Sequence, residues 1–127
     1  MRMTRELEGY MSALNHPMRA EVETILVALL SSDADIAAGV KWNAPSFTWK
    51  GEDRVTFRLH PKGWLQLILH RGARPRDGAF TFEDPTGLIT WLAKDRGMIE
   101  LKDSATVAAQ LSSIVAISRA WMLATAD

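Results

Sequence analysis

Two histidines and one glutamate occur in short segments in which apolar and polar residues alternate. His60 closes VTFRLH, His70 closes WLQLILH, and Glu100 lies in MIEL. Alternate residues of a strand point to the same face of a sheet, so these side chains are expected on its polar face with Arg58 and Gln66. Two imidazoles and a carboxylate are candidate ligands for a divalent metal, or groups for proton transfer. The alternative is a solvated face with cross-strand pairs such as Arg58 with Glu100.

The segment KWNAPSFTWK, residues 41–50, contains two of the five tryptophans. Aromatic rings beside a few polar groups suit a small planar or amphipathic ligand in a groove at the sheet. The alternative is that the rings fill the core, because an indole buries a large area and needs one partner for its N–H group. Trp64 is expected on the face opposite Leu65 and Leu67, so it is exposed or at an interface. The ligand-binding hypothesis uses Lys41, Trp42, Asn43, Pro45, Phe47, Trp49, Arg58 and Trp64.

Two other polar features favour structural roles. Asn15 or His16 stands before Pro17 at the start of a predicted helix, where a cap is expected rather than a catalytic group. RGARPRDG, residues 71–78, contains Arg71, Arg74 and Arg76. These arginines could hold a phosphate or an acidic partner, but such a run is usually a solvated loop.

No known catalytic signature is present: the sequence has no Gly-rich phosphate loop, metalloprotease pair or nucleophile elbow. It has no cysteine, which excludes disulfides and thiolate chemistry. Lys plus Arg equals Asp plus Glu at 15 each, so no net charge attracts nucleic acid or an anionic membrane. The longest apolar run, from Ile25 to Leu30, is too short to span a bilayer, and Glu6 and Glu8 interrupt any signal-peptide core. We therefore expect a cytoplasmic, non-enzymatic protein.

Hydrophobic periodicity predicts the elements that would position these side chains. The 127 residues have the size and composition of a single domain, residues 1–127. Apolar residues three or four positions apart predict helices. Strict alternation of apolar and polar residues predicts strands, with turns at Gly51 and Gly63. The expected fold is α+β, a single antiparallel sheet of about four to five strands with helices packed on one face. The helices are expected over 5–14, 15–33, 84–94 and from 104 onward, and the strands over 46–50, 55–60, 64–70 and 97–101.

Three stretches also carry a family resemblance: HPMRAEVETILVALLSS, VKWNAPSFTWKGE and FEDPTGLITWLAKDRGMIELKD. Together they resemble the YdhG-like family, domain-of-unknown-function family 1801, over residues 14–123. The family shows a Lys-Trp…Pro…Phe entry into the sheet and a later Leu…Trp-Leu-Ala…Asp-Arg segment. The matching positions are Lys41, Trp42, Pro45 and Phe47, then Leu88, Trp91, Leu92, Ala93, Asp95 and Arg96.

The resemblance implies an α/β sandwich and, through relatives described as iron-chaperone-like by comparison with frataxin, a role in iron handling. Iron is therefore the one cofactor that the resemblance implies. The sequence departs from the frataxin pattern, which clusters its acidic residues in a ridge. Here the acidic residues are dispersed: Glu21 and Glu23, Asp33 and Asp35, Glu52 and Asp53.

Three hypotheses follow. The first is a non-enzymatic domain that binds a small ligand or a partner through a Trp-lined groove beside the sheet. The second is a frataxin-like iron or metal protein that uses His60, His70 and Glu100. The third is an interaction domain that forms a homodimer through the exposed aromatic part of the sheet.

Overall fold

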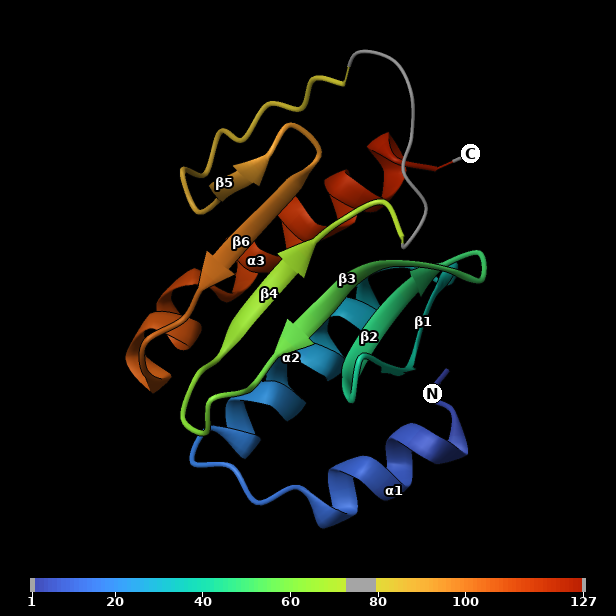
Figure 1. Ribbon diagram of the computed structural model, residues 1–127, viewed down its shortest axis with the longest axis vertical. Helices are drawn as coiled ribbons and strands as arrows, with labels where there is room; N and C mark the ends of the chain where they lie inside the picture. Colours follow the sequence, from blue (N-terminus) through green and yellow to red (C-terminus); the bar gives the residue numbers. More distant parts are fainter. Residues whose placement is uncertain (1, 73–79, 127) are drawn as a thin grey trace.

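The computed structural model describes residues 2–72 and 80–126 of the chain. Within them, two helices, α1 and α2, come first, the strands β1 to β6 follow, and the helix α3 comes last (Figure 1). The helices are α1 (Arg5–Ala13), α2 (Arg19–Ser32) and α3 (Ser104–Ala124). The strands are β1 (Ile36–Lys41), β2 (Ala44–Trp49), β3 (Glu52–Arg58), β4 (Gln66–Leu69), β5 (Thr90–Ala93) and β6 (Arg96–Glu100).

The strands form one antiparallel sheet of six strands in the order β1-β2-β3-β4-β6-β5. The first four strands are neighbours in sequence order, and the β5–β6 hairpin joins the sheet by pairing β6 with β4. The prediction of an α+β fold with a single antiparallel sheet is confirmed, and the sheet has slightly more strands than expected.

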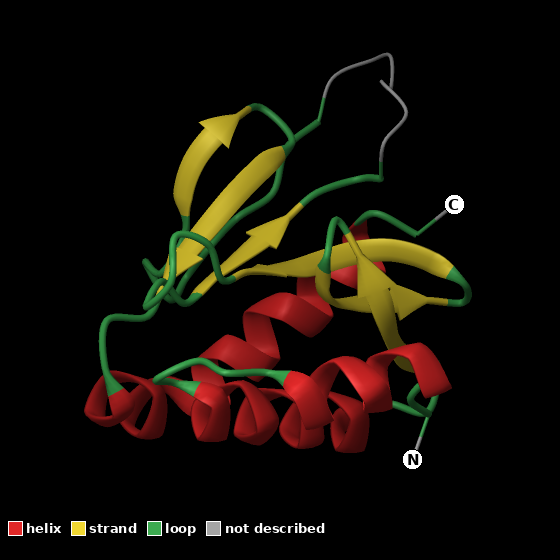
Figure 2. Ribbon diagram, turned by 60° about the horizontal axis from the view of Figure 1, so that its bottom comes forward, coloured by secondary structure: helices red, strands yellow, loops and turns green. Residues whose placement is uncertain are grey.

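All three helices lie on one side of the sheet (Figure 2). The inward face of the sheet carries Phe47, Val55, Leu67 and Ile99, which are at most 2% exposed. They pack with the apolar stripe of α2 and with the C-terminal half of α3. Burying this inner face is the main source of stability, because each large apolar side chain contributes about 1.5–3 kcal/mol. No helix of the described residues lies on the opposite, outer face of the sheet.

The N-terminal segment closes the β1 edge of the sheet. Thr4 caps α1 by accepting a hydrogen bond from the backbone N–H of Leu7, at 3.1 Å. The backbone N–H of Thr4 in turn donates to the carbonyl of Ala38 in β1, at 3.0 Å. Leu7 and Met11 are the buried residues of α1, so this helix covers the edge through one apolar face.

The predicted cap of the second helix is wrong in its position. The helix starts at Arg19, its N-cap is Met18, and no side chain caps it. The Nδ1 atom of His16 accepts the Met18 N–H at 3.0 Å, so its Nε2 atom donates to the carbonyl of Trp64 at 2.9 Å. His16 therefore joins the start of α2 to the loop before β4.

The predicted helix over residues 84–94 is also wrong. Asp84 resembles an N-cap, but its carboxylate accepts the backbone N–H groups of Gly87 and Ile89 at 3.2 and 2.8 Å and closes a turn. Gly87 has a φ of 71°, which a right-handed helix does not allow. The residues after the turn form β5, which pairs with β6.

Like β5, strand β1 was not predicted. It lies between the predicted helix over 15–33 and the predicted strand over 46–50, and it forms a hairpin with β2 in which Lys41 pairs with Ala44. Its sequence, IAAGVK, is too rich in small residues for a clear alternation of apolar and polar side chains. The hairpin places Trp42 and Asn43 at its tip.

Among the described residues, α3 is one helix whose length and composition are sufficient to cross a membrane. This is weak evidence, because core helices of soluble proteins meet the same criterion. In this structure Ile114, Ile117, Trp121 and Met122 are buried against the rest of the protein. Burial of these four side chains accounts for part of the apolar composition of α3.

Candidate functional site

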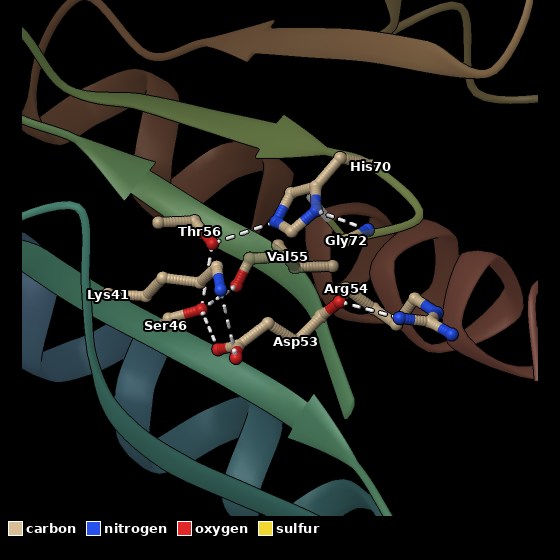
Figure 3. Close-up of polar contacts among 8 residues, drawn as sticks. All are labelled: Lys41, Ser46, Asp53, Arg54, Val55, Thr56, His70 and Gly72. Atoms are coloured by element: carbon tan, nitrogen blue, oxygen red, sulfur yellow. Dashed lines mark hydrogen bonds and ion pairs between the residues drawn. The ribbon is translucent and has the colours of Figure 1, made fainter. Parts of the chain in front are cut away.

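A chain of buried polar side chains crosses the outer face of the sheet (Figure 3). The Oγ atom of Ser46 lies 2.7 Å from Asp53 Oδ1 and 2.7 Å from Thr56 Oγ1, and Thr56 Oγ1 lies 2.9 Å from His70 Nε2. Ser46, Thr56 and His70 are each at most 2% exposed. They come from β2, β3 and the residue directly after β4, so the sheet register brings them together.

The direction of every hydrogen bond in this chain can be assigned. The backbone N–H of Gly72 donates to His70 Nδ1 at 2.9 Å, so that nitrogen carries a lone pair. The neutral ring then has its proton on Nε2 and donates to Thr56. Thr56 donates to Ser46, and Ser46 donates to the carboxylate of Asp53. The chain ends where Lys41 Nζ lies 3.8 Å from the other carboxylate oxygen.

Trp42 packs against the His70 end of this chain. Its ring lies 4.7 Å from the His70 ring, centroid to centroid, and the Arg96 guanidinium lies 5.8 Å from the same indole. Burial is the largest cause that lowers the pKa of His70, to about 4, and the positive charge of Arg96 is the next. Asp53 acts in the opposite direction, while Arg54 and Lys41 lower the pKa further. His70 is therefore neutral at physiological pH and has both ring nitrogens occupied.

The backbone at Trp42 is strained. Trp42 and Asn43 have φ values of 54° and 57°, the positive values that a type I′ hairpin turn requires at both central positions. Asn tolerates this region, but a bulky side chain there is uncommon and costs about 1–2 kcal/mol. Such strain is often found at ligand sites. Here it coincides with the placement of an indole over the outer face of the sheet.

An open pocket of about 540 Å³ lies beside Trp42 on this face. Trp42 comes from the β1–β2 turn and Leu92 from β5, and both are 50% exposed. Ile68 of β4 lies between them in the sheet order and also lines the pocket. The remaining lining residues are Ala44, Phe57, Arg58, Leu59, His60 and Arg96.

The polar lining of the pocket comes from two arginines, Arg58 and Arg96, and from His60. No carboxylate is among the described residues that line it. Arg58 lies 5.5 Å from the Trp64 ring, and Arg96 lies against Trp42. Within residues 2–72 and 80–126 neither guanidinium forms an ion pair, so both keep their charge-assisted hydrogen-bonding capacity for another group.

The ligand-binding set predicted from sequence divides into three parts. Trp42 and Arg58 line the pocket, and Lys41 and Asn43 belong to the turn that carries Trp42. Phe47 and Trp49 are core residues at 0% and 8% exposure, and Pro45 is buried inside β2 opposite Val40. Trp64 is exposed as predicted, but it borders a separate depression with Gln66 and Glu100. Half of the predicted set is therefore structural or lies elsewhere.

The structure does not bring the proposed metal ligands together. The backbone of His70 pairs with Arg54, whereas His60 is six residues beyond Arg54, a separation of about 20 Å for an extended chain. Glu100 pairs with Gln66 and accepts a hydrogen bond from its side chain at 3.2 Å. Among the described residues, no group of three His, Asp or Glu side chains could hold a metal ion.

The predicted polar face is present in the register Arg58, Gln66, Glu100, each residue opposite the next.

Arg74 and Arg76 lie outside the described residues. Arg71 forms an ion pair with Asp95 at 3.7 Å and lies 4.7 Å from the Phe80 ring, so it has a structural role beside the β5–β6 turn.

Sequence reasoning missed Ile68, Leu92 and Arg96 as pocket residues. Leu92 was assigned to the predicted helix over 84–94 and Arg96 follows that helix, so their position above the outer face of the sheet was not expected. The alternation of Ile68 with Leu67 and Leu69 was a usable signal, because it placed an apolar side chain on a polar face.

Searches for similar proteins found no matching family model, no matching curated protein and no matching solved structure. Membership of the YdhG-like family therefore stays a prediction from the motifs in the sequence.

Proposed function

We propose that this protein binds a small molecule with a flat apolar portion in the pocket between Trp42 and Leu92. The observation that carries the proposal is the indole of Trp42. It is held in a strained turn, half exposed, above a pocket whose lining includes an apolar strand residue, Ile68. Ligand pockets commonly combine an apolar surface with a few polar groups in this way.

The buried chain beneath Trp42 supports a binding role rather than a catalytic one. Both nitrogens of His70 and both hydroxyls of the chain are occupied by hydrogen bonds within the protein. A general base needs a free lone pair within reach of the substrate. In this arrangement His70 supports the indole ring, and the ligand contacts the ring from its exposed side.

An NMR titration with a panel of small planar aromatic compounds, neutral and charged, tests the proposal. We expect at least one compound to shift the amide signals of Trp42, Ile68 and Leu92 and the indole N–H of Trp42. The variants Trp42→Ala and Leu92→Ala should weaken that binding. Leu123→Ala is the matched control, because Leu123 on α3 is similarly exposed, at 48%, and does not line this pocket.

Two outcomes contradict the proposal. One is that no compound shifts these signals at millimolar concentration. The other is a set of shifts at the pocket that grows with protein concentration alone, since this result assigns the aromatic surface to a second copy of the chain. Sedimentation velocity on the same samples shows whether the protein self-associates, and so distinguishes shifts caused by a second copy of the chain from shifts caused by a bound compound.

A further inference from the structure

We infer that the ligand of this pocket is a small organic acid, whose anionic group binds at Arg58 and His60 while its apolar body lies over Ile68. This inference rests on the function proposed above and adds the chemical class of the ligand. Its basis is the chemistry of the lining: among the described residues that line the pocket, the titratable ones are Arg58, Arg96 and His60.

The register defines where the two arginines lie. Arg58 pairs with Gln66 at the start of β4, and Gly97, next to Arg96, pairs with Leu69 at its end. The two arginines therefore enter the pocket at different levels of β4. His60 follows Arg58 by two residues and lines the same pocket, so a second donor is present only at the Arg58 end. An acid group that accepts from both residues is favoured at that end.

Arg96 has a different local role. Its guanidinium lies 5.8 Å from the centroid of the Trp42 ring and is among the charges that face His70. It adds positive potential to the pocket, but its position is coupled to the indole by a cation–π contact. Arg58 is less constrained, because its aromatic partner, Trp64, is itself exposed and outside the pocket.

Two guanidinium groups that form no ion pair with the described residues, beside an apolar surface, suit an anion in particular. A carboxylate, sulfonate or phosphate would accept two parallel hydrogen bonds from one guanidinium. A neutral isostere of the same shape would keep the apolar contacts and lose the charge-assisted hydrogen bonds, which are shorter and stronger than neutral ones.

The decisive experiment compares 2-naphthoate with its neutral isostere, 2-naphthamide, by calorimetry and NMR at low ionic strength. We expect 2-naphthoate to bind the wild-type protein at least about tenfold more tightly, which corresponds to about 1.4 kcal/mol. R58Q should reduce naphthoate affinity to near that of naphthamide and leave naphthamide affinity unchanged. R5Q, which removes an exposed arginine on α1, is the control and should change neither affinity.

The results separate the two proposals. Equal affinity for the acid and the amide overturns the anion inference and leaves the binding function standing. Tighter binding of the acid that survives R58Q overturns the assignment to Arg58. Absence of binding by both probes contradicts the anion inference, whereas binding of other compounds in the panel would still support the pocket. R58Q should melt within a few degrees of the wild type, because Arg58 is exposed.

Discussion

The indole of Trp42 lies against the imidazole of His70, with ring centroids 4.7 Å apart and planes inclined by 47°. One residue is at the tip of the β1–β2 hairpin and the other follows β4, so the contact crosses two intervening strand pairings. The contact shields a buried histidine from water and at the same time sets one side of the pocket. Burial of His70 and the shape of the pocket therefore depend on the same aromatic ring.

Removal of this ring should raise the pKa of His70. In the Trp42→Ala variant water reaches the imidazole, so the main cause of its low pKa is weakened. We expect the pKa to move from about 4 towards the ordinary value of 6.5. An NMR titration of the imidazole carbon-bound protons measures it. Trp64→Ala should leave the His70 pKa unchanged, and a value that stays near 4 in Trp42→Ala would show that another group shields the ring.

The free energy of unfolding should decrease as the pH is lowered through a window set by the pKa values of His70. Its pKa is about 4 in the folded protein and 6.5 ordinarily, so between these values the unfolded chain binds a proton that the folded chain does not. The contribution of the neutral ring is therefore complete above about pH 6.5 and is lost as pH falls to about 4. Its upper limit is about 3 kcal/mol in the free energy of unfolding.

The comparison that isolates this effect is urea denaturation of the wild type and His70→Gln at several pH values. The glutamine variant has no group that titrates at this position, so its stability should vary less across the window. Parallel pH profiles for the two proteins would show that His70 does not contribute.

Loss of the Thr56 hydroxyl should lower the free energy of unfolding, because this one buried group is hydrogen-bonded to both Ser46 and His70. Thr56→Val preserves the shape of the side chain but leaves the His70 Nε2–H and the Ser46 hydroxyl without this buried partner. An unsatisfied buried polar group costs about 1–3 kcal/mol. Thr56→Ser retains the hydroxyl and is the control. Urea denaturation should rank Thr56→Val as clearly less stable than Thr56→Ser, and equal stabilities would contradict the assigned chain.

Two glycines should respond in opposite directions to alanine. A Cβ atom at Gly97 would lie 2.5 Å from Ile89 Cγ2, so Gly97→Ala should displace the turn before β5 and cost about 1–3 kcal/mol.

Gly9 lies within α1, and a Cβ there meets nothing within 4 Å. Gly9→Ala should stabilise the protein by about 0.5–1 kcal/mol, through helix propensity. Thermal denaturation of both variants is the measurement, and a stable Gly97→Ala would show that Ile89 relocates easily.

The fold was predicted well where the side-chain period was clear. Val55, Phe57 and Leu59, and likewise Leu65, Leu67 and Leu69, alternate with other residues, and each is buried in the structure. Prediction failed where local signals imitated another element. Asp84 and Pro85 resemble the start of a helix, yet Gly87 and the hydrogen bonds to Asp84 make a turn.

The candidate site was predicted less well, because a pocket depends on which elements meet. Trp42 and Arg58 were identified from residue type alone. Leu92 and Arg96 join them only because β6 pairs with β4, which brings the β5–β6 hairpin to the edge of β4 opposite β3. No local pattern in the sequence specifies that pairing.

By itself the sequence determined the class of fold, the buried face of the central strands and the polar register of Arg58, Gln66 and Glu100. These follow from the alternation of side chains along a strand, which is a local property. Only the tertiary structure decided that His60 and His70 are far apart, that Phe47 and Trp49 belong to the core, and that Trp42 packs against His70 at one end of a buried hydrogen-bonded chain. These relationships depend on strand order and on a hairpin turn with positive φ at both central residues, and both are settled when the whole sheet assembles.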